Sequence, residues 1–363
     1  MTTKDEPKGG GARSLAELHA LGIMKRMPAA FSLDSTEPVD IPTVTAPSLD
    51  GLTVALVPPA PLTEQDLVDR FDALRRQYAD RRERKPGEDV GAGDEVLLDV
   101  LGFANGRLLP FSTREDWRTY VVADPVLPGF FEALPGAKVG QSFGIELKLP
   151  DTYAVESLRG QTARFLLDVK AAQELRLLAD DSPELLKRLR MGSLTDVMRH
   201  LGDELARERT EEMDRLTQER VMDVLVERTQ VSLSTALVNE EIRRRWAETE
   251  RPILARKAFQ PDELQEALEG WQKDPLTRAD AARRLTLALA LRAIATRDGV
   301  QPEKKATDAL IDDLAGLSGV ARKDLGKAVK EDAALARRLY DLALHLATVD
   351  HVMKKVKLTA PAP

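Results

Sequence analysis

Residues 93–175 carry an alternation of apolar and polar side chains that is typical of strands. In the first repeat Val96, Leu98 and Val100 form an apolar face, and the residues between them form a wetter face. An Asn105-Gly106 pair follows, and Asn-Gly permits the positive φ angles of a two-residue hairpin turn. The alternation recurs in Phe143, Ile145, Leu147 and Leu149 and in Phe165, Leu167 and Val169. With a short helix at 128–134, this pattern predicts a small antiparallel half-barrel.

On either side of this region the apolar residues follow helical spacing. Thr63-x-x-Asp66 predicts a helix start, and Lys85-Pro86-Gly87 is expected to stop that helix. Asp181-Ser182-Pro183-Glu184 opens a further helix, and helical spacing continues to the C-terminal region. A long helix is expected over 193–229, with a middle section at 206–212 that is nearly all charged or polar. Such a helix either bridges solvent or awaits a partner.

Composition excludes several classes of protein. The 363 residues include no Cys, which rules out disulfides, thiolate metal sites and thiol nucleophiles. A formal charge of −7 disfavours electrostatic binding of nucleic acid or an anionic membrane. We expect a cytoplasmic protein, because the sequence shows neither a long apolar run nor a secretory signal. Phosphate-binding glycine motifs and metal-ligand spacing of histidines are also missing, so we expect no cofactor and no metal.

Several stretches together resemble a known family. PGFFEALPGAKVGQSF, followed by P-x-x-Y-x-x-x-x-L-x-G, resembles the FKBP-type prolyl isomerase domain inside trigger factor. SLDGLTVALVPPAPLTEQDLVDRFDALRRQ is similar to the segment before that domain, and SLTDVMRHLGDELARERTEEMDRL is similar to the start of the helical chaperone body after it. The resemblance implies an α+β fold, with an FKBP-like antiparallel half-barrel inserted in an all-α, arm-bearing chaperone body.

The resemblance also implies a division of the chain. We expect an extended N-terminal segment with one short helix (1–47), a strand and helix that belong to the C-terminal body (48–90), an isomerase-like domain (91–175) and a helical chaperone domain (176–363). Trigger factor carries a ribosome-binding domain with a G-F-x-x-G-x-x-P loop before its isomerase domain. That loop is missing from 1–47, so ribosome docking is not expected.

The family's prolyl pocket can be carried over residue by residue. The resemblance places Phe130 at the aromatic floor, Val126 and Leu127 at aliphatic walls, Trp117 at an aromatic wall and Tyr153 at the hydroxyl that reaches a peptide carbonyl. Three more positions of that pocket fall on Val100, Leu109 and Leu167. Pro110 stands where the family usually has an acid. The alternative is that these residues are only the core of a small β domain, which the pattern favours for Val100, Leu127 and Leu167.

Three functions follow from these expectations. The first is an ATP-independent holdase chaperone that binds unfolded or nascent polypeptide on a helical cradle through many weak contacts. The second is an active peptidyl-prolyl cis-trans isomerase in which Pro110 replaces the acid that the family usually has at that position. The third is a dedicated binding or assembly protein that reuses the trigger factor scaffold for one fixed partner.

Overall fold

The structure is a computed structural model that describes residues 39–104, 107–109, 112–123, 127–153, 158–257 and 259–360. It is a mixed helix and strand protein with two compact units, each made from separate stretches of the chain. The sheet unit comprises Val57–Leu216 and Arg245–Arg278. The helical unit comprises the chain up to Leu56, Thr217–Arg244 and the chain from Ala279 onward.

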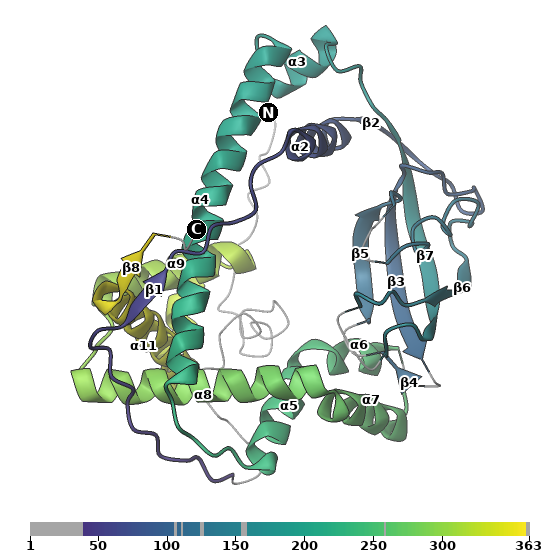
Figure 1. Cartoon of the computed structure of the whole chain (residues 1–363). Coiled ribbons are helices and arrows are strands. Elements are labelled where there is room, and N and C mark those ends of the chain that lie inside the picture. Colours follow the sequence, from purple (N-terminus) through teal and green to yellow (C-terminus); the bar gives the residue numbers. More distant parts are fainter. Residues whose placement is uncertain are drawn as a thin grey trace, which may run out of the picture. The chain divides into compact units, whose positions relative to one another are not determined.

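The sheet unit contains a curled antiparallel sheet, drawn in blue and teal in Figure 1. Its order is β2-β7-β3-β4, with β5 also paired to β3 and β6 also paired to β7. The strands are β2 (Asp80–Glu83), β3 (Glu95–Ala104), β4 (Arg107–Leu108), β5 (Arg114–Tyr120), β6 (Ser142–Lys148) and β7 (Thr162–Arg176). The predicted half-barrel is thus confirmed. Asn105 and Gly106 lie outside the described residues, but β3 and β4 pair on either side of them, with Ala104 opposite Arg107.

One face of this sheet forms the core of the sheet unit. The inward side chains of β3 and β7 are buried, as their period-two pattern predicts, and they pack on Phe130, Phe131 and Leu134. The segment that contributes these aromatic residues differs from the short helix expected at 128–134. It forms consecutive turns, in which the N–H of Phe130 donates to the carbonyl of Leu127 at 3.2 Å and that of Leu134 to Phe131 at 3.2 Å.

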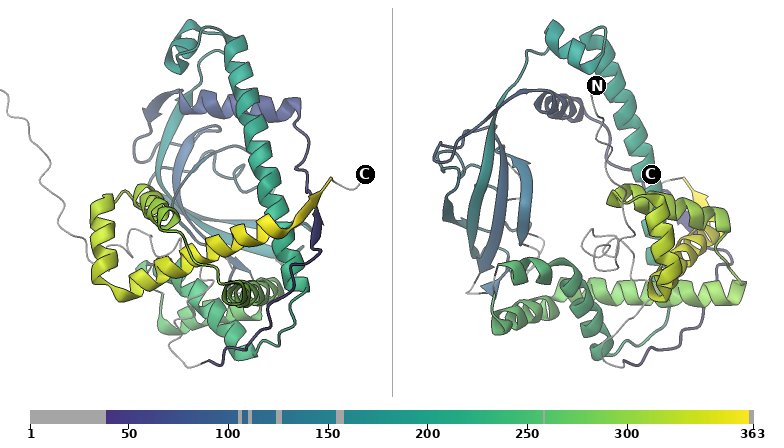
Figure 2. Two further views of the ribbon diagram at one scale, coloured as in Figure 1. Left: turned by 90° about the vertical axis from the view of Figure 1, so that its left-hand side faces the viewer. Right: turned by 180° about the vertical axis from the view of Figure 1, so that it is seen from behind.

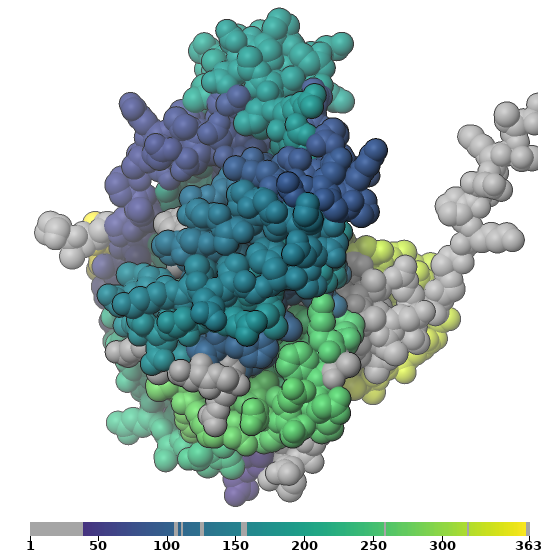
Figure 3. Space-filling view, turned by 90° about the vertical axis from the view of Figure 1, so that its right-hand side faces the viewer, coloured from purple at the N-terminus to yellow at the C-terminus, as the bar shows by residue number. Residues whose placement is uncertain are grey.

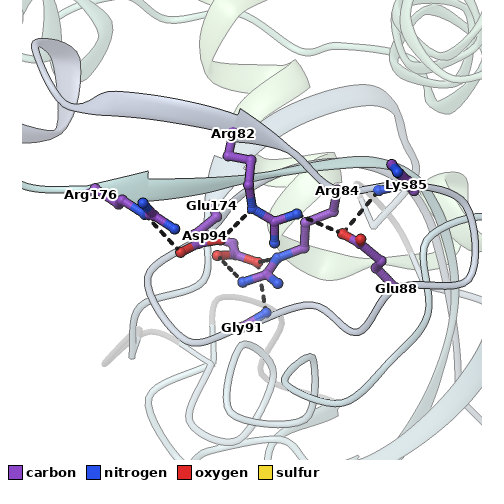
Figure 4. A network of polar contacts seen from close by, with 8 residues as sticks. All are labelled: Arg82, Arg84, Lys85, Glu88, Gly91, Asp94, Glu174 and Arg176. Atoms are coloured by element: carbon purple, nitrogen blue, oxygen red, sulfur yellow. Dashed lines mark hydrogen bonds and ion pairs between the residues drawn. The ribbon is translucent and has the colours of Figure 1, made fainter.

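Strand β2 corrects the expected end of the first helix. That helix, α2 (Glu64–Gln77), begins with the predicted capping box between Thr63 and Asp66 but ends well before Lys85. The next residues pair with the end of β7 instead. Figure 4 shows the polar contacts that hold this edge: Arg82 binds Glu174 at 2.7 Å and Glu88 at 3.0 Å, and Arg84 pairs with Asp94. Glu174 and the end of β7 are about ninety residues away from β2 in the sequence, so helical spacing alone could not reveal this pairing.

The outward face of β3 also differs from its predicted character. The sequence assigns Glu95 and Asp99 to a wetter face, yet these carboxylates are only 5% and 3% exposed. Glu95 pairs with Arg81 and Arg118, and Asp99 pairs with Lys170 and Lys257. A buried carboxylate is stable only when it is paired or hydrogen-bonded, and these cations meet that requirement.

Helices make up most of the remaining chain. They are α3 (Pro183–Leu189), α4 (Leu194–Glu227), α5 (Thr235–Thr249), α6 (Arg251–Arg256), α7 (Pro261–Lys273), α8 (Pro275–Asp298), α9 (Lys304–Ser318), α10 (Arg322–Glu331) and α11 (Ala333–Lys355). Ser182 caps α3 with Pro183 in its first turn, as predicted. Within the described residues, no helix has both the length and the apolar content needed to cross a membrane.

Two short strands close the helical unit. β1 (Thr53–Ala55) pairs in parallel with β8 (Lys357–Thr359), and Figure 2 shows them side by side beyond the end of α11. Leu52 and Val54 are buried there with residues of α4, α8 and α11. Residues 49–55, which precede the sheet unit in the sequence, therefore pack with helices that follow it, so the sheet unit is an insertion in the sequence of the helical body.

Candidate functional site

The sheet unit has an open cavity of about 160 Å³ at the inward face of its sheet. Its walls are largely aromatic, and the described residues that line it include one formal charge, on Arg114. The lining residues are Val100, Ser112, Arg114, Trp117, Leu127, Phe130, Phe131, Tyr153 and Phe165. A small concave site of apolar walls with a few polar groups is the usual form of a ligand-binding site.

Neighbouring strands bring these side chains together. Val100 on β3 lies opposite Leu167 on β7 and opposite Arg114 on β5. Two residues further along β3, Gly102 lies opposite Phe165. A Cβ at this glycine would lie 2.9 Å from Cε1 of Phe165 and 2.9 Å from Cβ of Ser112. Glycine at 102 therefore leaves the space in which both lining side chains fit.

The floor of the cavity is a cluster of aromatic rings. Phe130 meets Phe131 edge to face at 5.1 Å and Phe165 edge to face at 5.4 Å between ring centroids. Trp117 lies 6.2 Å from Phe130 and 5.7 Å from Phe131. Such pairs add about 0.5–1.5 kcal/mol each beyond the burial of their area. The rings consequently form a rigid apolar floor on which a flat apolar group can stack.

The structure places the predicted pocket residues in two groups. Val100, Trp117, Leu127, Phe130 and Tyr153 line the cavity. Leu109 and Leu167 are buried in the core cluster without lining the cavity, and Val126 lies outside the described residues.

Sequence reasoning missed four of the lining residues: Ser112, Arg114, Phe131 and Phe165. Phe165 has the period-two pattern of β7, as does Leu167 two residues away on the same face, so the pattern alone does not distinguish them. Phe131 stood in the quoted PGFF string beside Phe130. No sequence signal marks Arg114, because the bulge in the β3–β5 pairing between Leu98 and Val100 changes which residues face inward. Ser112 precedes β5 and reaches the cavity beside Gly102, to whose backbone it hydrogen-bonds, and no local pattern signals that contact.

Tyr153 provides a hydroxyl at the cavity. Burial raises the pKa of Tyr153, and the positive charge of Arg114 lowers it in part. The net shift is upward, so the hydroxyl stays protonated at neutral pH and can donate a hydrogen bond to a carbonyl oxygen. Within the described chain, no three His, Asp or Glu side chains converge as metal ligands. The chemistry that this cavity offers is stacking, desolvation and the Tyr153 hydroxyl as a donor beside a cation.

Comparison with known proteins gives a consistent assignment. A family model described as "Bacterial trigger factor protein (TF) C-terminus" matches residues 193–354. Trigger factor of Novosphingobium aromaticivorans is 30% identical over 273 residues, which are 75% of this chain and 52% of that protein. This chain therefore spans about half the length of that relative. Trigger factor of Actinobacillus pleuropneumoniae serotype 5b is 24% identical over 333 residues, 92% of this chain and 73% of that protein.

A solved structure titled "Promiscuous Substrate Recognition in Folding and Assembly Activities of the Trigger Factor Chaperone" also aligns, with a TM-score of 0.39 and 19% identity. The alignment covers 87% of this chain and 73% of that one. The sequence relatives extend over the sheet and the helices alike, and the helical match begins with α4. Together these matches support the assignment of this chain to the trigger factor family.

Proposed function

We propose that this protein is an ATP-independent holdase chaperone that binds unfolded polypeptide through scattered apolar sites on its helices. Family membership supports a chaperone-like role, and one observation in the helical unit carries the proposal. Tyr340 and Leu346 on α11 are each 45% exposed although both are large and apolar. They line two adjacent open cavities of about 260 and 450 Å³, which share Val300 and Gln301 as a common wall. We call this pair of cavities the α11 grooves.

The α11 grooves mix apolar and charged side chains. Leu310, Ala343 and Ala347 accompany Leu346 in the larger groove, together with Asp350 and Lys354. Burying the exposed half of one such apolar side chain contributes about 1 kcal/mol, which corresponds to about fivefold in affinity. Single contacts of this size are weak, but several of them on one chain raise the overall affinity through multivalency. Weak individual contacts also allow release of a folded client without nucleotide hydrolysis.

Suppression of aggregation tests this proposal. The Tyr340→Ser/Leu346→Ser double variant is compared with the wild-type protein, using a chemically denatured client diluted into buffer and followed by light scattering. We expect the concentration needed for half-suppression to rise at least fivefold. Val68→Ser on α2 is the matched control, because Val68 is equally exposed (47%) but lies in the sheet unit. Equal loss in the control, or no loss in the double variant, contradicts the proposal.

The aromatic cavity favours a second candidate, peptidyl-prolyl isomerisation. Its ring floor can take a prolyl side chain and remove water from the imide, and the Tyr153 hydroxyl can reach a carbonyl, which together would lower a barrier of about 18–20 kcal/mol. A protease-coupled assay on X-Pro peptides separates this activity from binding. We expect Tyr153→Phe and Phe130→Leu to reduce any turnover. Turnover at the uncatalysed rate, with aggregation still suppressed, would exclude the enzyme and retain the holdase.

One finer expectation from the sequence is part of this proposal. The chain is expected not to dock on ribosomes, and co-sedimentation with ribosomes tests this. The alternative to a general holdase is a dedicated binding or assembly protein with one fixed partner. Affinity purification separates the two, because a dedicated protein is expected to give a single stoichiometric band and a general holdase many bands.

A further inference from the structure

Outside the cavity, a buried carboxylate joins α6 to the sheet. Glu250, the residue that precedes α6, is 4% exposed. Its Oε1 accepts a hydrogen bond from the hydroxyl of Thr113 at 2.9 Å. Its Oε2 accepts the indole N–H groups of Trp246 at 3.1 Å and Trp271 at 2.7 Å. All three donors are themselves buried, so each carboxylate oxygen is held by groups that solvent does not reach.

Further contacts fix this end of α6 on the sheet. Arg256 pairs with Glu115 on β5, and Lys257 pairs with Asp99 on β3. Helix α7 packs nearby, where a Cβ on Gly270 would lie 4.0 Å from the carbonyl oxygen of Leu108. In Figure 3 the green helical atoms of this region adjoin the blue and teal atoms of the sheet. Glu250 is therefore held from both sides, by Trp246 and Trp271 of the neighbouring helices and by Thr113, the residue that precedes β5.

The contact reaches the cavity through one peptide unit. Thr113 immediately precedes Arg114, and Nη1 of Arg114 donates a hydrogen bond to the carbonyl of Thr113 at 3.0 Å. Burial raises the pKa of Glu250, and its hydrogen bonds and the charge of Arg114 oppose that shift. The same guanidinium also acts on Tyr153 across the cavity. Arg114 therefore lies within electrostatic reach of both the buried carboxylate and the cavity hydroxyl.

We propose that Glu250 is a positioning residue for the cavity: through Thr113 it fixes Arg114 at the rim, and the cavity thereby selects peptides that carry a carboxylate next to an inserted prolyl or aromatic side chain. This inference rests on the proposed role of the cavity as a peptide-binding site. The planar guanidinium binds a carboxylate with two parallel hydrogen bonds, and a pre-positioned guanidinium loses less conformational freedom on binding. The formal charge of the whole chain is −7, so overall electrostatics does not favour an acidic ligand and the preference must come from this local cation.

Peptide affinities test the ligand chemistry. Two fluorescent peptides of identical sequence, with Glu or Gln next to a central proline, are titrated with the full-length protein and followed by polarisation. The wild type is expected to bind the Glu peptide about three- to tenfold more tightly at low salt, and less selectively at high salt. Arg114→Gln is expected to abolish the ratio. The control Arg118→Gln removes a cation of the same strand that pairs with Glu95 instead, and is expected to keep the ratio. An unchanged ratio in Arg114→Gln overturns the inference.

A second set of variants tests the positioning role. Glu250→Gln keeps the shape of the side chain but turns one acceptor oxygen into a donor, and Thr113→Val removes the hydroxyl. Both are expected to reduce the Glu-to-Gln ratio while the Gln peptide still binds, whereas Thr113→Ser restores the ratio. If Glu250→Gln fails to fold, the comparison of Thr113→Val with Thr113→Ser tests the positioning role instead. A wild-type ratio in Thr113→Val overturns the positioning role.

The outcome for the holdase proposal is read separately. If the wild-type protein binds neither peptide, the cavity is not a peptide site and this inference is overturned. The holdase proposal is tested independently of this result, by the suppression of client aggregation in the wild type and in the α11 groove variants.

Discussion

Some charged side chains of the sheet unit are buried, and residues of other strands and helices supply the opposite charges that pair with them. Asp99 shows how this is achieved. Burial alone raises the pKa of Asp99, but hydrogen bonds from Lys170, Lys257 and the backbone N–H of Asp116 outweigh it and hold the pKa below its ordinary value. The ionised form is thus the one that the folded state prefers, and Asp99 links β3 to β7 and to the residue after α6.

Replacing Asp99 by Asn is expected to lower the free energy of unfolding by about 1–3 kcal/mol at neutral pH, because two cations lose their charged partner. The lowered pKa of Asp99 sets the sign of the pH effect. The contribution of Asp99 to the free energy of unfolding is present at pH values above its unfolded-state pKa. This contribution is lost as the pH falls through the folded-state pKa of Asp99. The difference between wild type and variant should therefore shrink below about pH 4, as measured by urea unfolding.

Asp116→Asn is the matched control. Asp116 pairs with Lys170 at the surface and has a φ of 50°, a conformation that Asn tolerates. We expect a loss of less than about 1 kcal/mol. An equal loss in the two variants would show that burial of Asp99 does not matter.

At the scale of elements, helix α4 has a polar middle section that lies between two apolar sections, and each apolar section packs in a different core cluster. Its first part packs Val197 and Leu201 against Phe71 of α2 and Leu185 of α3. Its last part joins a different cluster through Val221 and Leu225. From 206 to 216 no residue is buried. Of the two interpretations of this middle section, the solvent-bridging one fits these residues, although ion pairs from α2 (Arg70–Glu208 and Asp66–Arg209) also reach it.

The start of α2 gives a test of local helix stability. The side chain of Thr63 accepts a hydrogen bond from the N–H of Asp66, and the Asp66 carboxylate accepts one from the N–H of Thr63. Thr63→Ala removes the first of these and is expected to cost about 1 kcal/mol. Thr63→Ser retains the hydroxyl and is expected to cost much less. Hydrogen exchange of the amides in the first turn of α2 measures both. Equal protection in the Ala and Ser variants would show that the cap contributes nothing.

At the scale of the whole molecule, each unit depends on segments that are distant in sequence. The helical unit needs Leu49, Leu52 and Val54 to pack with residues of α4, α8 and α11, and Leu52 is among its most deeply buried side chains. The chain's three tryptophans, at 117, 246 and 271, all lie in the sheet unit. Tryptophan fluorescence therefore reports on the sheet unit, whereas circular dichroism of the helices reports on both units.

Leu52→Ala is expected to destabilise the helical unit by about 2–5 kcal/mol, because it removes buried methyl groups and leaves a cavity. A chain with two units need not unfold in a single step. We expect the denaturant midpoint followed by circular dichroism at 222 nm, a wavelength that reports helix content, to fall further than the midpoint followed by fluorescence. Equal shifts in both signals would mean that the two units unfold together.

The sequence by itself determined the features that depend on neighbouring residues. The alternation in 95–104, 142–148 and 162–169 determined the strands of the half-barrel, and Thr63 and Ser182 determined two helix starts. The resemblance also identified the family and five side chains of the cavity. The strands and helix starts can be predicted because the face of a strand or helix and a helix cap depend on residues that are only a few positions apart.

Only the tertiary structure decided where buried polar groups find their partners. Glu250 and Thr113 are 137 residues apart, and Lys257 and Asp99 are 158 apart. No local pattern marks such a pair, since a carboxylate in sequence looks the same whether it faces water or two indole groups. The same reason explains why no local pattern predicts Arg114 at the cavity or strand β2 after α2: each depends on a partner strand that folding brings alongside.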